Sequence, residues 1–178
     1  MESPRLILPF AFVLFVYAAG VPALMSAIGT SSLPRVSLSA DGIQPRTIEQ
    51  RTGEAITHDY AQAWQDLTDA LNTNRVDPLN DYFTGEAKRR ITQRITEQKH
   101  AGVRTQYMDA GHKVKAVFYS PDGGEMQLED QAELDVKIFD GNRTIYSGNL
   151  RQKYLVLMTA GADRWYVRSL ESVPENTF

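Results

Sequence analysis

The sequence predicts an α+β protein, in which an N-terminal transmembrane helix precedes a domain of helices packed on a curved four-stranded antiparallel sheet. Three observations predict this class. A stretch without charged residues runs from Leu6 to Ile28. Apolar residues then recur at helical spacing over residues 48–100, and at alternate positions over residues 107–172. A run of helices followed by a run of strands is typical of α+β domains, whereas α/β domains alternate the two.

The stretch Leu6–Ile28 is long enough to be a membrane anchor. A transmembrane helix needs about 20 consecutive apolar residues, whereas the apolar core of a signal peptide has about 7 to 15. A cleaved signal peptide is the alternative, with its core at 7–20 and a cleavage site at 21–23. The apolar character continues to Ile28, which favours the anchor. Arg5 precedes the stretch, so the positive-inside tendency places the N-terminus in the cytoplasm.

Composition divides the chain into three parts. Residues 1–28 are the expected anchor of a single-pass protein of the bacterial inner (cytoplasmic) membrane. Residues 29–46 are rich in proline, glycine and serine, which predicts an extended stalk. Residues 47–178 carry the helical and strand patterns, and they are numerous enough to bury a hydrophobic core. We expect this C-terminal domain to lie in the periplasm.

Two amphipathic helices are expected in the domain. The first runs from Ile48 to Asn72, and Thr47 with Gln50 fits a capping box at its start. The second runs from Gly85 to about His100. Apolar residues at helical spacing mark the two buried faces: Ile56, Tyr60, Ala63, Trp64, Leu67 and Leu71 in the first helix, and Ala87, Ile91 and Ile95 in the second.

Four strands follow, each with apolar side chains at alternate positions. Their expected ranges are 107–119, 126–138, 143–159 and 165–172. A bulge is expected in the first of them, at Ala110-Gly111. Two glycine-containing turns, at 122–124 and 140–142, join antiparallel neighbours. Long strands twist and curl, so the concave face of the sheet is the natural place to bury the first helix.

The order of these elements resembles the nuclear transport factor 2-like superfamily of cone-shaped α+β domains. The resemblance covers about Ile48–Val173. It rests on the amphipathic helix containing AQAWQDLTDAL, the helical hairpin after it, and the late strands ending in RWYVRSLE. Membrane-anchored members of this class include scaffold and accessory subunits of membrane assemblies, and soluble members include small isomerases and dehydratases. The resemblance therefore implies the fold and leaves the function open.

Composition excludes several functional classes. The chain has a formal net charge of −3, which gives no reason to expect nucleic acid as a partner. It has no cysteine, which excludes disulfides, thiolate metal sites and a cysteine nucleophile. It contains no zinc-protease, phosphate-loop or nucleophile-elbow motif. We therefore expect no cofactor, no metal site and no catalytic residues.

One pair of residues is a candidate for acid–base chemistry. His112 shares its strand parity with Val114, and Asp130 interrupts the apolar row of the next strand. Both are expected to point inward, where a carboxylate beside a histidine can act as an acid–base pair. The alternative is a pair that only supports the structure. The other two histidines, His58 and His100, fit a solvent-facing flank and the end of a helix.

The second helix is basic, because Lys88, Arg89, Arg90 and Arg94 outnumber its two glutamates. A solvated face is the simplest interpretation. The functional alternative is contact with lipid headgroups or with an acidic partner.

Three hypotheses of function follow. The leading one is a non-enzymatic accessory or scaffold subunit of a larger membrane protein complex, with membrane lipid and other membrane-protein subunits as its partners. The kind of complex (secretion, respiratory or photosynthetic) stays open. The second is a module that binds a small apolar ligand inside the cone. The third is an isomerase or hydrolase that uses His112 and Asp130. The candidate pocket residues are Tyr107, His112, Phe118, Asp130, Tyr154 and Trp165.

Overall fold

A computed structural model describes residues 33–174, in which the main helices precede the long strands as expected. The helical elements are α1 (Gln50–Thr73), the short 3-10 helix η1 (Asp77–Asn80) and α2 (Gly85–His100). The strands are β1 (Val36–Ser39), β2 (Val103–Tyr119), β3 (Glu125–Asp140), β4 (Arg143–Ala160) and β5 (Trp165–Val173). The α+β prediction is confirmed for these residues.

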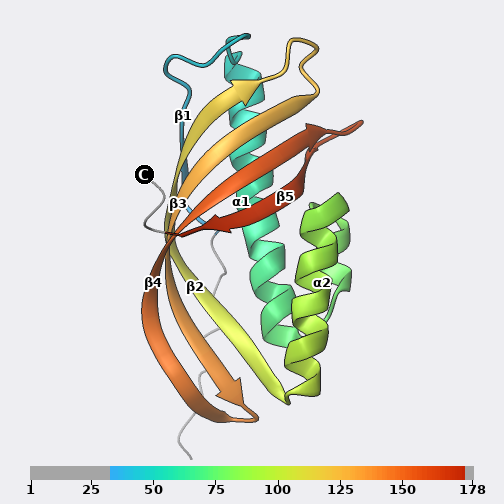
Figure 1. The fold of residues 1–178 in the computed structure, drawn as a ribbon, viewed down its shortest axis with the longest axis vertical. Helices are drawn as coiled ribbons and strands as arrows, with labels where there is room; N and C mark the ends of the chain where they lie inside the picture. Colours follow the sequence, from blue (N-terminus) through green and yellow to red (C-terminus); the bar gives the residue numbers. More distant parts are fainter. Residues whose placement is uncertain (1–32, 175–178) are drawn as a thin grey trace, which may run out of the picture. The chain divides into compact units, whose positions relative to one another are not determined.

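The five strands form one sheet in the order β1-β2-β3-β4-β5. β1 is parallel to β2, and each of the other neighbouring pairs is antiparallel. Figure 1 shows the long strands β2, β3 and β4 curving along their length, with α1 and α2 on one side of them. The buried side chains of the sheet and of the two helices form a single core, so the functional groups on the concave face of the sheet are placed by this packing.

α1 presents one apolar face to the sheet. Its buried apolar residues recur at helical intervals: Ile56, Tyr60, Ala61, Ala63, Trp64, Leu67, Ala70 and Leu71. The capping box predicted at its start is wrong, because the helix begins at Gln50 after Glu49 and no side chain caps it. Glu49 instead forms an ion pair with Arg46 at 3.1 Å. The stability of this helix therefore depends more on packing against the sheet than on capping of its first turn.

The stalk predicted for residues 29–46 is wrong from Val36 onward. Val36–Ser39 pairs in parallel with residues 112–115 of β2, so the sheet has a fifth strand and is not wholly antiparallel. Ile43 is also part of the core, with 5% of its surface exposed. The two apolar residues of β1 alternate with serines, which is a strand pattern, but it is only four residues long. The prolines and serines around it are typical of a linker, so the composition of the segment does not predict a strand.

Two bulges in β2 decide which of its side chains face the core. The pairing with β3 slips between Asp109 and Gly111, where a bulge was predicted, and again between Ala116 and Phe118. The second slip leaves Phe118 on the outer face, 37% exposed, and turns Tyr119 into the core, 4% exposed. Strict alternation through this strand would predict the opposite.

Within residues 33–174, no helix is both long enough and apolar enough to cross a membrane. The anchor predicted at Leu6–Ile28 lies outside the described residues, as do the first residues of the predicted stalk.

Candidate functional site

Three polar side chains meet inside the curved sheet, and we call them the interior polar cluster: Tyr60 from α1, His112 from β2 and Asp130 from β3. The Tyr60 hydroxyl donates a hydrogen bond to Asp130 Oδ2 at 2.8 Å. His112 Nδ1 lies 2.7 Å from the same oxygen. The side chains of His112 and Asp130 are both 0% exposed. Asp130 therefore joins the helix to two strands of the sheet from a fully buried position.

Aromatic rings separate this cluster from solvent. The Trp64 ring lies 4.4 Å from the His112 ring, measured between centroids, with the planes tilted by 39°. Tyr60 meets the same imidazole edge-on at 5.8 Å, and Tyr154 meets Trp64 edge-on at 5.4 Å. General acid–base catalysis requires hydrogen-bond contact with the reacting group. Because neither side chain has exposed surface, the pair as it stands cannot make such contact with a molecule in solution.

Burial also affects the Tyr60 hydroxyl of this cluster. It raises the pKa of the Tyr60 hydroxyl well above the usual value, and the negative charge of Asp130 raises it further. Tyr60 therefore remains a proton donor throughout the physiological pH range. Asp130 Oδ1 is buried and has no hydrogen-bond partner among the described residues. All the observed contacts of the carboxylate thus go through Oδ2, and they hold structural elements together.

A second feature of the concave side is a groove of about 380 Å³, which we call the basic groove. Its walls come from both helices and from β2, β4 and β5, and they include Trp64 and Tyr154. Arg94 Nη2 donates a hydrogen bond to the Tyr107 hydroxyl at 2.8 Å, and its guanidinium lies 5.7 Å from the Tyr107 ring centroid. The lining contains two arginines and no carboxylate. Arg90 is paired with Glu86 and Glu171 outside the lining, so Arg94 is the charge that attracts anionic groups into the groove.

Four of the six predicted pocket residues belong to one or the other of these two places. His112 and Asp130 belong to the interior polar cluster. Tyr107 and Tyr154 line the basic groove. The Trp64 ring lies between the two places, because it contacts His112 and also lines the groove. The structure therefore brings these residues near one another without forming a shared cavity.

The other two predicted pocket residues lie elsewhere, which corrects the sequence prediction. Phe118 faces outward because of the second bulge in β2. Trp165 is buried, but it packs near Tyr119, with ring centroids 6.4 Å apart, and it does not line the basic groove. One apolar pocket built from all six residues is therefore absent from the described part of the chain.

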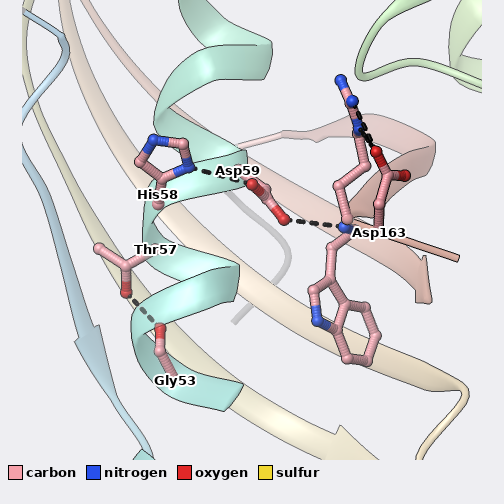
Figure 2. A network of polar contacts seen from close by, with 7 residues as sticks. Gly53, Thr57, His58, Asp59 and Asp163 are labelled. Atoms are coloured by element: carbon pink, nitrogen blue, oxygen red, sulfur yellow. Dashed lines mark hydrogen bonds and ion pairs between the residues drawn. The ribbon is translucent and has the colours of Figure 1, made fainter. Parts of the chain in front are cut away.

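Asp59 makes a buried contact that the sequence pattern did not single out. Asp59 Oδ2 accepts a hydrogen bond from the backbone N–H of Trp165 at 2.8 Å, which ties α1 to the start of β5 (Figure 2). Asp59 Oδ1 lies 3.1 Å from His58 Nδ1. Figure 2 shows His58 turned along the helix toward Asp59. The side chain of His58 is 58% exposed, so this contact lies at the protein surface.

Tyr60 and Trp64 were expected in the core of α1, without a role in the site. A signal was present, because a buried tyrosine hydroxyl usually finds a hydrogen-bond partner. Tyr60 is the residue of α1 that reaches Asp130. Among residues 33–174, no three histidine, aspartate or glutamate side chains are grouped so that they could hold a metal ion.

Comparisons with known proteins show similarity at the level of the fold. No protein-family model matches the chain, and no curated protein matches it. Among solved structures, the intermembrane space region of the chloroplast protein ARC6 superposes with a TM-score of 0.60 at 17% identity, covering 74% of this chain and 100% of that one. A putative scytalone dehydratase from Novosphingobium aromaticivorans gives a TM-score of 0.46 at 12% identity, covering 68% and 83%.

A third structure is a Nostoc punctiforme protein with a cystatin-like fold, with a TM-score of 0.44 at 12% identity, covering 72% of this chain and 96% of that one. At such identities a likeness shows the fold alone. The curved sheet with helices against one side agrees with the α+β architecture expected from the sequence, and the ARC6 region shares this fold.

Proposed function

We propose that this protein is a non-enzymatic, single-pass accessory or scaffold subunit of a larger membrane protein complex, with its folded domain on the outer, periplasmic side of a bacterial inner membrane. The observation that carries the proposal is the burial of the His112–Asp130 pair. This pair was the candidate for acid–base chemistry, and both side chains are 0% exposed behind Trp64 and Tyr154. A pair in that position stabilises a domain without processing a substrate.

Two further observations support the proposal. The stretch Leu6–Ile28 has the length and composition of a spanning helix. The solved structure with a TM-score of 0.60 is a region of a chloroplast protein that lies in an intermembrane space, which is a compartment next to a membrane. A domain held at a membrane and without an open reaction site is suited to contact neighbouring proteins.

The burial of His112 can be tested by its chemical reactivity. Diethyl pyrocarbonate modifies exposed histidines, and the folded chain contains its own control, because His58 is 58% exposed. We expect mass spectrometry to find His58 modified rapidly and His112 modified only after denaturation. Rapid modification of His112 in the folded protein would mean that solvent reaches the pair, and it would favour the isomerase or hydrolase hypothesis.

The membrane and partner parts of the proposal need a second experiment. We expect the full chain to stay in the membrane fraction after alkaline carbonate extraction, and to crosslink to other membrane proteins in mild detergent. Its intact mass should include residues 6–28. A carbonate-soluble chain, a mature N-terminus after residue 23, or a monomer that crosslinks to nothing would each contradict the proposal.

The ligand-binding hypothesis keeps one specific observation in its favour. The basic groove has a volume of about 380 Å³, and pockets for small ligands start at about 300 Å³. Its two arginines change the expected ligand from a purely apolar molecule to one that also carries an anionic group. Saturable binding of an amphipathic carboxylate such as decanoate, measured by calorimetry, would support this hypothesis. Undetectable binding at millimolar concentration would remove it.

A further inference from the structure

β4 has a neighbouring strand on both sides along only half of its length. Residues 153–160 pair with β5, whereas residues 143–152 pair with β3 alone. β5 ends at Val173, whose carbonyl accepts a hydrogen bond from the Gln152 side-chain amide at 3.0 Å. Pro174 follows and has no N–H with which to extend the ladder. Among the described residues, no strand covers the remaining edge of β4.

The regular part of this open edge is Tyr146–Gln152. A bulge leaves Ile145 unpaired between Thr144 and Tyr146, and bulges discourage pairing at an edge. After the bulge, the register with β3 is continuous to the end of the open edge. An edge strand presents N–H and C=O groups at alternate residues for pairing with another chain. Tyr146 is 51% exposed and Leu150 is 36% exposed, so the edge also offers apolar contact.

Hollows flank this edge on both faces of the sheet. The basic groove lies on the concave face, and a second hollow of about 400 Å³ is lined by the outward-facing residues Lys113, Glu133 and Lys153. Leu150 and Gln152 line both hollows. Successive side chains of an extended peptide point to opposite faces of a sheet. A strand added to β4 would therefore direct alternate side chains into the two hollows.

The two hollows beside the open edge are lined mainly by basic residues, although the whole chain has a net charge of −3. The two hollows are lined by five basic residues and one acidic residue: Arg90, Arg94, Lys113, Arg151 and Lys153, with Glu133. Arg90 contacts Glu86 at 2.6 Å and Glu171 at 3.8 Å, and Glu133 lies 3.5 Å from Arg151. Arg94, by contrast, bonds to the neutral Tyr107 hydroxyl, so its charge faces the groove without a carboxylate in the lining.

We propose that the open edge of β4 binds an extended, acidic segment of a partner protein, which adds as a strand beside Tyr146–Gln152. The backbone of the segment pairs with the edge, one apolar side chain contacts Leu150, and carboxylates meet Arg94 and the basic residues of the outer hollow. A second copy of this chain matches less well, because Tyr146–Gln152 carries Arg151 and no acidic residue. This proposal rests on the proposed scaffold function, and it specifies the surface and the chemical class of the partner.

A random nonapeptide display library, selected against the full chain in detergent micelles, tests the proposal. We expect the selected peptides to be rich in aspartate and glutamate, with apolar residues at alternate positions. Hydrogen exchange of the full chain, saturated with the tightest synthetic peptide, should show new protection at Tyr146–Gln152. Selection of neutral or basic peptides, selection of none, or protection elsewhere would overturn the proposal.

Charge variants separate the role of the groove from general electrostatics. Arg94→Glu should weaken the tightest peptide by about tenfold or more, measured by fluorescence polarisation. Arg89→Glu is the matched control, because it makes the same change on the same helix outside the lining of the groove. It should leave the affinity nearly unchanged. Equal weakening by both variants would show only long-range attraction and would contradict the site.

Proline variants test the backbone pairing. Ser147→Pro and Gly148→Pro are made separately, since neighbouring N–H groups of a strand point to opposite sides, and only one of the two faces the open edge. The variant that retains the wild-type melting temperature should lose peptide binding. If both variants unfold, the exchange protection decides the question. A wild-type dimer that dissociates on either substitution would assign the edge to a second copy instead.

The outcome for the scaffold function stays separate from these tests. Membrane retention of the full chain is measured by carbonate extraction in the same preparation. A chain that leaves the membrane but still binds acidic peptides at β4 contradicts the anchor and retains the docking edge. A chain that stays in the membrane without binding them does the reverse.

Discussion

The interior polar cluster and the basic groove both adjoin the indole ring of Trp64. The polar groups of the cluster are buried, whereas those of the groove are open to solvent. His112 and Asp130 are fully buried and bonded within the protein. Arg94, on the other side of Trp64, lines an open groove and bonds to one tyrosine hydroxyl. A titratable pair is often taken as the mark of a reaction site. Here the pair that looks catalytic is buried and bonded within the fold, and the charged groups that line the open groove are arginines.

The energetic reason is the cost of burying charge. An ionised carboxylate inside a protein must be paired and hydrogen-bonded, because desolvation outweighs an imperfect contact. An arginine at a groove keeps its water and needs no partner of its own. Burial therefore couples Asp130 to stability, whereas exposure makes Arg94 nearly neutral for stability and free for recognition. Four substitutions test this contrast, in order of decreasing effect.

Asp130→Ala should have the largest effect on folding. It removes the shared acceptor of Tyr60 and His112 and leaves both groups buried without it. Loss of one member of a buried pair costs about 3 to 5 kcal/mol. Urea denaturation followed by circular dichroism measures the change. Asp130→Asn keeps the size and a carbonyl acceptor, so it should cost less, and equal stability of the alanine variant and the wild type would refute a supporting role.

Asp59→Ala should have the second largest effect. The substitution leaves the buried backbone N–H of Trp165 without its acceptor, at a cost of about 1 to 3 kcal/mol. The loosened region should be the contact between α1 and the start of β5, so amide exchange near Trp165 should rise first. Asp59→Asn is the matched control, since its side-chain oxygen still accepts that hydrogen bond. Exchange that rises evenly over the whole sheet would not fit this local role.

Asp66→Asn should stabilise the protein, in contrast to the first two substitutions. Burial, followed by the charges of Asp81 and Asp69, raises the pKa of Asp66 from 3.8 to about 6. A carboxyl group with a raised pKa in the folded state favours folding while it is protonated, so stability falls as pH rises from about 4 to about 6.

The gain from Asp66→Asn at pH 7.5 should be about 1 kcal/mol after allowance for solvent screening. At pH 4 the gain should be close to zero. Urea denaturation at both pH values measures it. Asp69→Asn removes only a neighbouring charge and should gain less. A gain that is the same at both pH values would indicate a cause other than ionisation.

Arg94→Ala should have the smallest effect on stability, within about 0.5 kcal/mol, as is usual for exposed positions. The residue is exposed and contributes one hydrogen bond, to the Tyr107 hydroxyl. Thermal denaturation measures the change. A loss similar to that of Asp130→Ala would mean that the groove, like the interior polar cluster, serves the fold, and the contrast between the two regions would disappear.

Long periodic patterns made the helices and long strands predictable from the sequence. The buried apolar faces of α1 and α2 follow from helical spacing alone, and the alternation in β3 predicts its inward row, including Asp130. The four residues of β1 were missed, since so short a pattern is overridden by the prolines and serines near it. Its pairing with β2 is a tertiary contact, which no local propensity encodes.

The residues of the site were predictable only where the sequence shows which face of the sheet each side chain points to. His112 shares its parity with Val114, so its inward direction could be inferred, and both are buried. Phe118 follows a second bulge, and no glycine in the sequence indicates that bulge. The basic groove depends on which arginines of α2 lie opposite the end of β5. That relation between distant segments appears only in the folded structure.

The second bulge has a consequence for how this segment can change in length. Phe118 and Tyr119 are opposite consecutive residues of β3, Gln127 and Met126, and Val117 is the extra residue before them. Removal of that residue would leave both neighbours in phase with their partners. Removal of Lys115, two positions earlier, would move the side chains between that position and the bulge to the opposite face of the sheet. In homologues of this protein, insertions and deletions within this strand should therefore accumulate at position 117. The chain length can vary there without a change in which residues form the core.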